Sequence, residues 1–212
     1  MVTLLHEHNI NYMNTILIAG DSFGADWTVK YTNKMGWPNI MENSFDVTNV
    51  AQAGCSEYKI LQQLQKVNLS DYGVVIVNHT SPYRLYVKDH PIHKDNVLHH
   101  SSDLLYGDLK YHFEQTQDQS IMPIVEYFEN YFDIDYAKFV YNLIYREIHT
   151  LCEPNTIHLS HIGLSEIKKL ECRDIHEIDM FKNNSGLMNH YSSDGNIEIA
   201  RTITTMVNGL LK

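Results

Sequence analysis

The sequence predicts one α/β domain, a three-layer α/β/α sandwich with a parallel sheet. Three observations predict this fold class. Short apolar runs rich in β-branched residues, typical of buried strands, alternate along the chain with longer amphipathic segments. Strands that alternate with helices favour a parallel sheet between two layers of helices. The chain has 212 residues, a usual length for one domain, and 43% of them are hydrophobic, which is enough for a sizeable core.

The first half of the chain supplies three of the expected strands. The run at 74–77 is apolar on both faces, as expected for a central strand of a parallel sheet. Ser56 is a good N-cap residue and precedes an apolar stripe with helical spacing. In order, the sequence predicts a strand at 15–19, a short helix near 26–33 followed by a loop, a strand at 47–51, a helix after Ser56 and a strand at 74–77.

Residues 81–133 interrupt this alternation. They are polar, aromatic and rich in histidine, and only one short helix is expected among them, at 125–131. A stretch of this length between a strand and the next clear helix is usually functional or carries small elements of its own. We interpret residues 81–133 as an insertion over the carboxyl edge of the sheet and call them the insertion.

The last third of the chain returns to the alternation. The sequence predicts a helix at 135–152, a strand at 156–160, an extended segment within 175–181 and a final helix that starts near Ser192 or Ser193. Apolar residues at helical spacing predict the buried faces of the two helices: Ala137, Tyr141, Ile144, Ile148 and Leu151 in the first, and Ile197, Ala200, Ile203, Val207 and Leu210 in the second.

Composition excludes several classes of protein. The formal net charge is −10 and no basic run is present, which argues against nucleic acid and anionic membranes as partners. The three cysteines are too few and too far apart for a disulfide framework or a zinc knuckle. Residues 1–14 lack the pattern of a signal peptide, and no apolar run approaches the ~20 residues that cross a bilayer. We therefore expect a cytoplasmic protein.

One serine stands directly after the first predicted strand, in the run Gly20-Asp21-Ser22-Phe23. Open parallel sheets bind ligands at the carboxyl ends of their strands. The run resembles the first of four ordered sequence blocks in the SGNH/GDSL hydrolases, whose fold is a flavodoxin-like three-layer sandwich. This resemblance implies that Ser22 is a nucleophile and that its backbone N–H is one donor of an oxyanion hole.

The second and third blocks would supply the other oxyanion donors. The run from Asn49 to Gly54 is similar to the second block, and the resemblance implies that the Gly54 N–H is a donor. Asn78 matches the asparagine of the third block at the end of the strongest strand, and its side-chain amide would be the third donor. The block is degenerate, because Ile76 stands where much of the family has glycine and His79 where it has aspartate.

The fourth block, which leads into the last helix, would supply the general base. His190 matches the histidine of the family, and the usual histidine pKa near 6.5 suits a base at neutral pH. Many members carry an aspartate three residues earlier, where this chain has Leu187. Asp179, Asp194 or a backbone carbonyl could orient His190 instead, and a Ser–His dyad is also chemically workable.

Other polar residues near these blocks are candidates for contact with substrate. Asp21, His79 and Arg84 are candidate substrate-binding residues, and the guanidinium of Arg84 suits a carboxylate or phosphate. The histidines of the insertion match no defined zinc motif, and we interpret them as part of a polar lid: His90, His93, His99 and His100. The sequence predicts neither a metal nor another cofactor.

Together these observations predict a serine-dependent ester hydrolase that removes an acetyl or other acyl group from a sugar or small metabolite. Two alternatives remain: an acyltransferase that uses the same serine, and a catalytically inactive binding protein with the SGNH fold. A metal-dependent hydrolase that uses the histidines of the insertion is a weaker third alternative. The expected partner is a small-molecule or carbohydrate ester, and the sequence makes no prediction of the oligomeric state.

Overall fold

A computed structural model describes residues 14–29, 35–152, 154–160, 174–176 and 191–212. Within these residues, five parallel strands form one sheet in the order β2-β1-β3-β6-β7. The strands are β1 (Thr15–Gly20), β2 (Asp46–Asn49), β3 (Val74–His79), β6 (Thr156–Ser160) and β7 (Asp174–His176). The predicted fold class is therefore confirmed.

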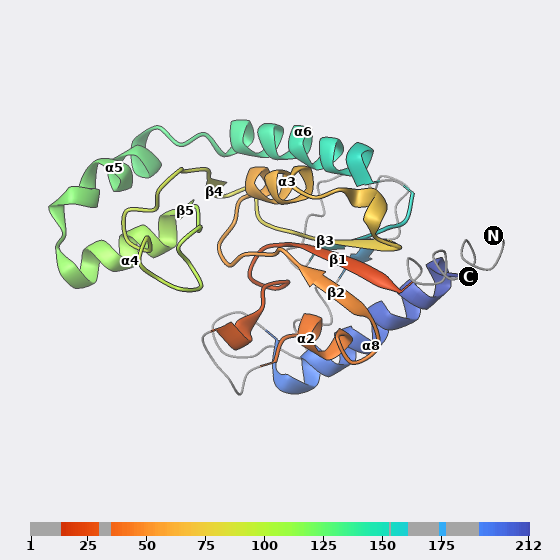
Figure 1. Ribbon diagram of the computed structural model, residues 1–212. Helices are drawn as coiled ribbons and strands as arrows, with labels where there is room; N and C mark the ends of the chain where they lie inside the picture. The colour runs from red at the N-terminus through yellow and green to blue at the C-terminus, as the bar shows by residue number, and fades with distance from the viewer. Residues whose placement is uncertain (1–13, 30–34, 153, 161–173, 177–190) are drawn as a thin grey trace.

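Helices cover both faces of the sheet, which gives the three layers (Figure 1). One face is covered by α3 (Glu57–Gln65) and α6 (Ile134–Cys152), which pack against each other. The other face is covered by α2 (Trp37–Met41) and α8 (Ser193–Leu210). Short 3-10 turns lie at η1 (Trp27–Val29) and η2 (Leu69–Asp71).

Side chains that alternate along the strands fill two separate cores. Ile16, Ile18 and Ile76 are fully buried against the α2 and α8 layer. Leu17 and Val77 are fully buried against the α3 and α6 layer. Because successive side chains of a strand point to opposite faces, the last two residues of β3 extend these two rows in opposite directions. Asn78 therefore faces the α2 and α8 side, and His79 the α3 and α6 side.

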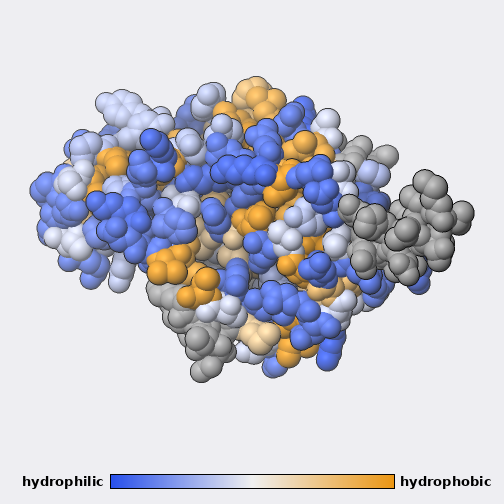
Figure 2. Space-filling view, viewed as in Figure 1, coloured by the Kyte–Doolittle hydropathy of each residue, from blue (hydrophilic) through white to orange (hydrophobic). Residues whose placement is uncertain are grey.

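The insertion forms a small unit of its own beside the sheet (Figure 1). Its elements are β4 (Arg84–Leu85), β5 (Leu104–Leu105), α4 (Tyr106–Thr116), η3 (Gln119–Ile121) and α5 (Met122–Asn130). The two short strands pair antiparallel. Buried apolar side chains give the insertion a third, separate core: Leu104, Leu109, Ile121 and Val125. Figure 2 shows mostly hydrophilic side chains over the insertion, on its left.

Most elements lie within a few residues of their predicted positions. Ser56 caps α3 as expected, because its hydroxyl accepts a hydrogen bond from the Lys59 N–H at 3.5 Å. Of the helix predicted near 26–33, only the η1 turn lies in the described residues. Where a loop was predicted, α2 forms, and Pro38 favours its start because its fixed φ suits the first helical turn. The helix α4 was not predicted.

Two apolar side chains that were predicted to be buried are exposed. Leu151 is 39% exposed and Ile197 is 40% exposed. In α6 the buried face runs through Tyr145 and Cys152 instead, and in α8 Ile199 is fully buried. Both stripes are therefore rotated slightly from the predicted ones. Among the described residues, no helix combines the length and the apolar character needed to cross a membrane.

Candidate active site

Ser22 lies at the carboxyl edge of the sheet, two residues beyond the end of β1. In the sheet order, the connection from β1 leads to β2 on one side, whereas β3, on the other side of β1, leads away to β6, so the strand order reverses between β1 and β3. This topological switch point is where open α/β sheets bind ligands. Ser22 is 6% exposed, and the carbonyl oxygen of this residue accepts a hydrogen bond from the Trp27 indole N–H at 2.9 Å.

Asp21 fixes the turn that carries Ser22. Its Oδ1 accepts hydrogen bonds from the Phe23 N–H at 3.0 Å and from the Asn78 amide nitrogen at 2.8 Å. Its carbonyl oxygen accepts from the Gly24 N–H at 3.1 Å. The carboxylate of Asp21, predicted as a substrate contact, therefore joins the turn after β1 to the end of β3.

A close approach of two strands places Asn78 beside this turn. Gly20 pairs with Asn78 and has φ +154°, and a Cβ built on Gly20 would lie 2.6 Å from the Asn78 Cβ and carbonyl oxygen. Only glycine fits there. The side chain of Gln63 in α3 accepts from the Gly20 N–H at 2.8 Å and donates to the Gly20 carbonyl at 3.1 Å. The end of β1 is thus held against the end of β3.

The insertion holds Gly54 in a conformation that favours glycine. Gly54 has φ +79°, and a Cβ built there would lie 2.5 Å from the Ser102 Cβ. The Gly54 carbonyl accepts hydrogen bonds from the Asp103 N–H at 2.9 Å and from Arg84 Nη1 at 3.2 Å. Arg84 also donates through Nε to Thr80 Oγ1 at 3.1 Å. Arg84, predicted as a substrate contact, therefore donates two of its N–H groups to hydrogen bonds within the protein.

The predicted oxyanion donors keep unused hydrogen-bonding capacity. In the described part of the chain, the buried N–H groups of Ser22 and Gly54 donate no hydrogen bond, and neither does the Ser22 hydroxyl. The Asn78 amide uses one N–H for Asp21 and keeps a second. Since more than 90% of buried backbone N–H groups in proteins are paired, two unpaired ones among the described residues, just beyond the carboxyl ends of the neighbouring strands β1 and β2, are notable.

The proposed general base is not among the residues that the structure describes. His190, Leu187 and Asp179 lie outside the described residues. Asp194 lies in the first turn of α8. The pairing of Ser22 with His190 and the identity of the group that orients His190 therefore stay predictions.

A second polar cluster lies on the other face of the sheet. His79 Nδ1 bonds to Glu57 Oε1 at 2.5 Å, and His79 Nε2 bonds to His158 Nδ1 at 2.8 Å. The ring of His149, from α6, stacks on that of His158 with centroids 3.6 Å apart. We call His79, His149 and His158 the histidine cluster. His79, predicted as a substrate contact, thus has both ring nitrogens bonded inside the protein.

Burial keeps two members of this cluster neutral. Burial, followed by the effect of the neighbouring His79, lowers the pKa of His149 to about 4. Burial also lowers the pKa of His158, followed by the effects of His79 and His149. Tyr145 packs against the rings of His79 and His149, with centroid distances of 4.5 and 4.3 Å. The histidine cluster is therefore a stacked, mainly neutral assembly beside the Glu57 carboxylate.

The three imidazoles are close enough to suggest a metal site, but their rings do not aim at one point. One ring nitrogen of each lies within 4.8 Å of the others. The planes are nearly parallel, with angles of 3°, 16° and 15° between pairs. An imidazole binds zinc along its ring plane at about 2.0–2.1 Å. Stacked parallel rings cannot direct their lone pairs at one ion, so the cluster as it stands does not fit a metal.

The histidines of the insertion form no converging set of ligands either. The rings of His90 and His93 stack with centroids 4.5 Å apart, and His93 lies 5.6 Å from His99. His90 Nδ1 accepts hydrogen bonds from the backbone N–H groups of Ile92 and His93 at 3.1 and 3.2 Å. Burial lowers the pKa of His90 to about 4. These contacts give His90 a role in shaping its loop.

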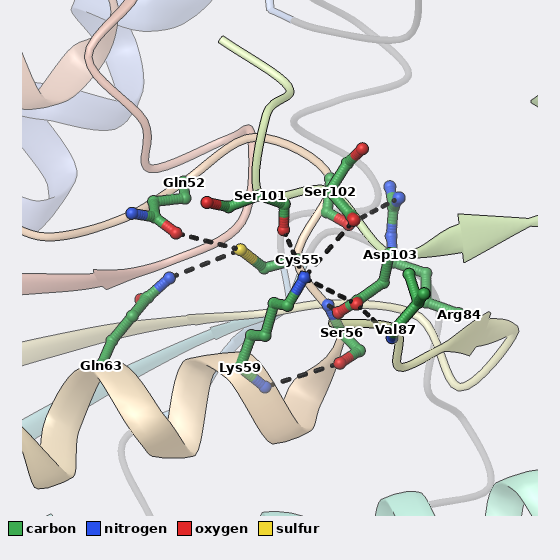
Figure 3. A network of polar contacts seen from close by, with 11 residues as sticks. Gln52, Cys55, Ser56, Lys59, Gln63, Arg84, Val87, Ser101, Ser102 and Asp103 are labelled. Atoms are coloured by element: carbon green, nitrogen blue, oxygen red, sulfur yellow. Dashed lines mark hydrogen bonds and ion pairs between the residues drawn. The ribbon is translucent and has the colours of Figure 1, made fainter. Parts of the chain in front are cut away.

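A buried ion pair fastens the insertion to α3 (Figure 3). Lys59 Nζ lies 2.8 Å from Asp103 Oδ1, and the Asp103 side chain is fully buried. Asp103 also accepts hydrogen bonds from the backbone N–H groups of Ser56 at 2.7 Å and Val87 at 2.9 Å. Sequence patterns did not connect Lys59 with Asp103, because the two residues are 44 positions apart in the chain and belong to no common motif.

Comparison with family models, curated protein sequences and solved structures finds no match to this chain. The resemblance to SGNH/GDSL hydrolases therefore rests on the four sequence blocks alone.

Proposed function

We propose that this protein is a serine-dependent ester hydrolase of the SGNH/GDSL type that removes a small acyl group from a sugar or small metabolite. One observation carries the proposal. A buried serine stands at the topological switch point of a parallel sheet, and within the described residues the N–H groups of Ser22 and Gly54, beyond the ends of β1 and β2, donate no hydrogen bond. Preorganised donors aimed at developing negative charge usually make the largest single contribution to acyl-transfer catalysis.

Each group has a defined role in the proposed reaction. The Ser22 hydroxyl attacks the ester carbonyl while His190 accepts its proton. The oxygen of the tetrahedral intermediate takes hydrogen bonds from the Ser22 N–H, the Gly54 N–H and the second N–H of the Asn78 amide. When the tetrahedral intermediate collapses, His190 donates the proton to the leaving alcohol, and the acyl group stays on Ser22. Water, activated by His190, then attacks this acyl-enzyme in the same way and releases the acid.

Covalent labelling tests the nucleophile. A fluorophosphonate probe at neutral pH should modify the folded protein once, at Ser22, as shown by peptide mass spectrometry. Ser22→Ala should abolish both the labelling and the cleavage of 4-nitrophenyl acetate. Ser81→Ala is the matched control, because Ser81 is also a buried serine just beyond the end of a central strand. Its hydroxyl accepts a hydrogen bond from the Tyr83 N–H, and we assign it no catalytic role.

The outcomes separate this function from its alternatives. Absence of labelling at Ser22 in folded protein would overturn the proposal and favour a binding protein. Labelling at Ser22 together with acyl transfer to an added alcohol, in preference to water, would favour an acyltransferase.

We also propose that the protein acts in the cytoplasm. Cys55 and Cys152 are free, buried thiols, as expected for a protein in a reducing compartment. The net charge of −10 supports a small ester, rather than nucleic acid or an anionic membrane, as its partner.

A further inference from the structure

Ser102, in the insertion, lies directly over Gly54. Its Cβ lies 2.5 Å, and its Oγ 3.6 Å, from the position of a Cβ built on Gly54. Ser102 is 4% exposed. Within the described residues, its hydroxyl makes no hydrogen bond. A buried hydroxyl without a partner therefore stands next to a backbone N–H that also has none.

The position of Ser102 is fixed by its backbone. Its N–H donates to the His99 carbonyl at 2.9 Å, and its carbonyl accepts from Lys59 Nζ at 3.4 Å. The next residue, Asp103, is bonded to Gly54 and Lys59. Figure 3 shows the Ser102 side chain pointing away from the Lys59–Asp103 pair, with no dashed line to its hydroxyl. The position of the hydroxyl is thus fixed, although no described residue forms a hydrogen bond with it.

Such a group needs an explanation. Leaving a buried hydroxyl unpaired costs free energy, and native proteins pair most of these groups. The exceptions call for an explanation, and a catalytic role or an ordered water is among the usual ones. Since the site proposed for the ester oxygen lies at the Gly54 N–H, a bound ester is the ligand best placed to pair with this hydroxyl.

We propose that the Ser102 hydroxyl binds substrate in the proposed ester site, donating a hydrogen bond to an oxygen of the ester that lies at Gly54. This inference rests on the proposed function of Ser22. It makes the insertion a fixed wall of the substrate site.

Single substitutions test this role, with 4-nitrophenyl acetate as the probe. Ser102→Ala should lower kcat/KM about three- to tenfold, the usual worth of one neutral hydrogen bond. The same change should leave the melting temperature unchanged or raise it, because the hydroxyl makes no bond in the free protein. Ser102→Cys, which keeps the size but donates weakly, should give an intermediate kcat/KM. Ser101→Ala is the control, since among the described residues Ser101 forms a hydrogen bond only through its carbonyl oxygen, with Lys59.

Two results would overturn the inference. An unchanged kcat/KM in Ser102→Ala would mean that the hydroxyl binds only water. A melting temperature that falls in parallel with activity would mean that its role is structural. Ser22→Ala, measured in the same series, separates the two proposals: if it keeps full activity, the proposed nucleophile fails. If it is inactive while Ser102→Ala is unaffected, only the role of Ser102 fails.

Discussion

Two neighbouring residues at the end of β3 belong to two contrasting polar regions. Asn78 belongs to the serine site, which we define as Ser22, Gly54 and Asn78. His79 belongs to the histidine cluster, on the opposite side of the sheet. In the serine site, N–H groups and a hydroxyl are left unused within the described residues. In the cluster, His79 is bonded through both ring nitrogens and lies among stacked aromatic rings.

If the proposed function holds, the contrast separates a region that carries the chemistry from one that stabilises the fold. A polar network whose members bond to one another makes a protein interior rigid and specific. Donors that are fixed but unpaired cost stability and are available to a reacting group. Substitutions in the serine site should therefore change rate more than stability, and substitutions in the histidine cluster should do the reverse.

The largest effect is expected from removing the Asn78 amide. Asn78→Ala should lower kcat for ester cleavage by about 10²–10³-fold, the usual cost of one oxyanion donor. Steady-state kinetics on protein verified as folded measures this effect. Asn39→Ala is the matched control, because Asn39 is also buried and donates to an aspartate, Asp26, at 3.0 Å. A loss of less than threefold in Asn78→Ala would remove Asn78 from the serine site.

The next effect concerns stability alone. Glu57→Gln keeps the shape of the side chain but removes the charge that faces His79, so it should destabilise the protein by about 1–3 kcal/mol. Urea unfolding measures this change. Glu147→Gln, on the exposed side of α6, should have little effect. The kcat of folded Glu57→Gln should stay within about twofold of the parent, and a much larger loss would connect the cluster to catalysis.

The pH dependence of stability should report the two neutral histidines. His149, with its pKa lowered to about 4, and His158, also lowered, stay neutral in the folded protein, whereas the unfolded chain binds protons near pH 6.5. The unfolded state therefore takes up more protons as the pH falls from about 6.5 toward 4, and stability is lost in that window. Each histidine contributes up to about 1.4 kcal/mol per pH unit.

Unfolding free energies between pH 7.5 and 4.5 measure this slope. His149→Phe keeps an aromatic ring in the stack with Tyr145 and removes one titrating group, so it should flatten the slope. An equal slope in parent and variant would show that His149 is not kept neutral in the folded protein.

The smallest effect is expected from metal ions. Since the rings of the histidine cluster are nearly parallel, added Zn²⁺ should leave the melting temperature unchanged and bind at much less than one ion per chain. Calorimetry with metal analysis measures both. One tightly bound ion that raises the melting temperature, with both effects lost in His149→Ala, would show that the rings turn to bind it.

The fold was largely predictable because the strands of the sheet and the helices around it carry clear local sequence patterns. The fully apolar run of β3 and the Ser56 cap of α3 are local signals, and the structure confirms them. The helix α4 was missed because its local signals are weak: Leu109 is its only buried residue, and Leu105 at its N-cap makes no side-chain cap. Helices held by tertiary packing alone leave little trace in local sequence.

The two polar regions also differ in how far the sequence indicated them. Ser22, Gly54 and Asn78 each follow a predicted strand, so strand ends and a family resemblance were enough to group them. Glu57, His79, His149 and His158 were not grouped, since they come from α3, β3, α6 and β6 and share no spacing. Ser102 gave no signal either, because its significance depends on a contact across the fold with Gly54.

The separate core of the insertion has a consequence for dynamics. Leu104, Leu109, Ile121 and Val125 pack with one another apart from the two cores that line the sheet. The insertion can therefore behave as its own cooperative unit, opening while the strands stay closed. In hydrogen exchange, amides of α4 and α5 would then lose protection before those of β3. Ser102 would keep its place beside Gly54 during such openings, because the adjacent Asp103 is bonded to Gly54 and Lys59.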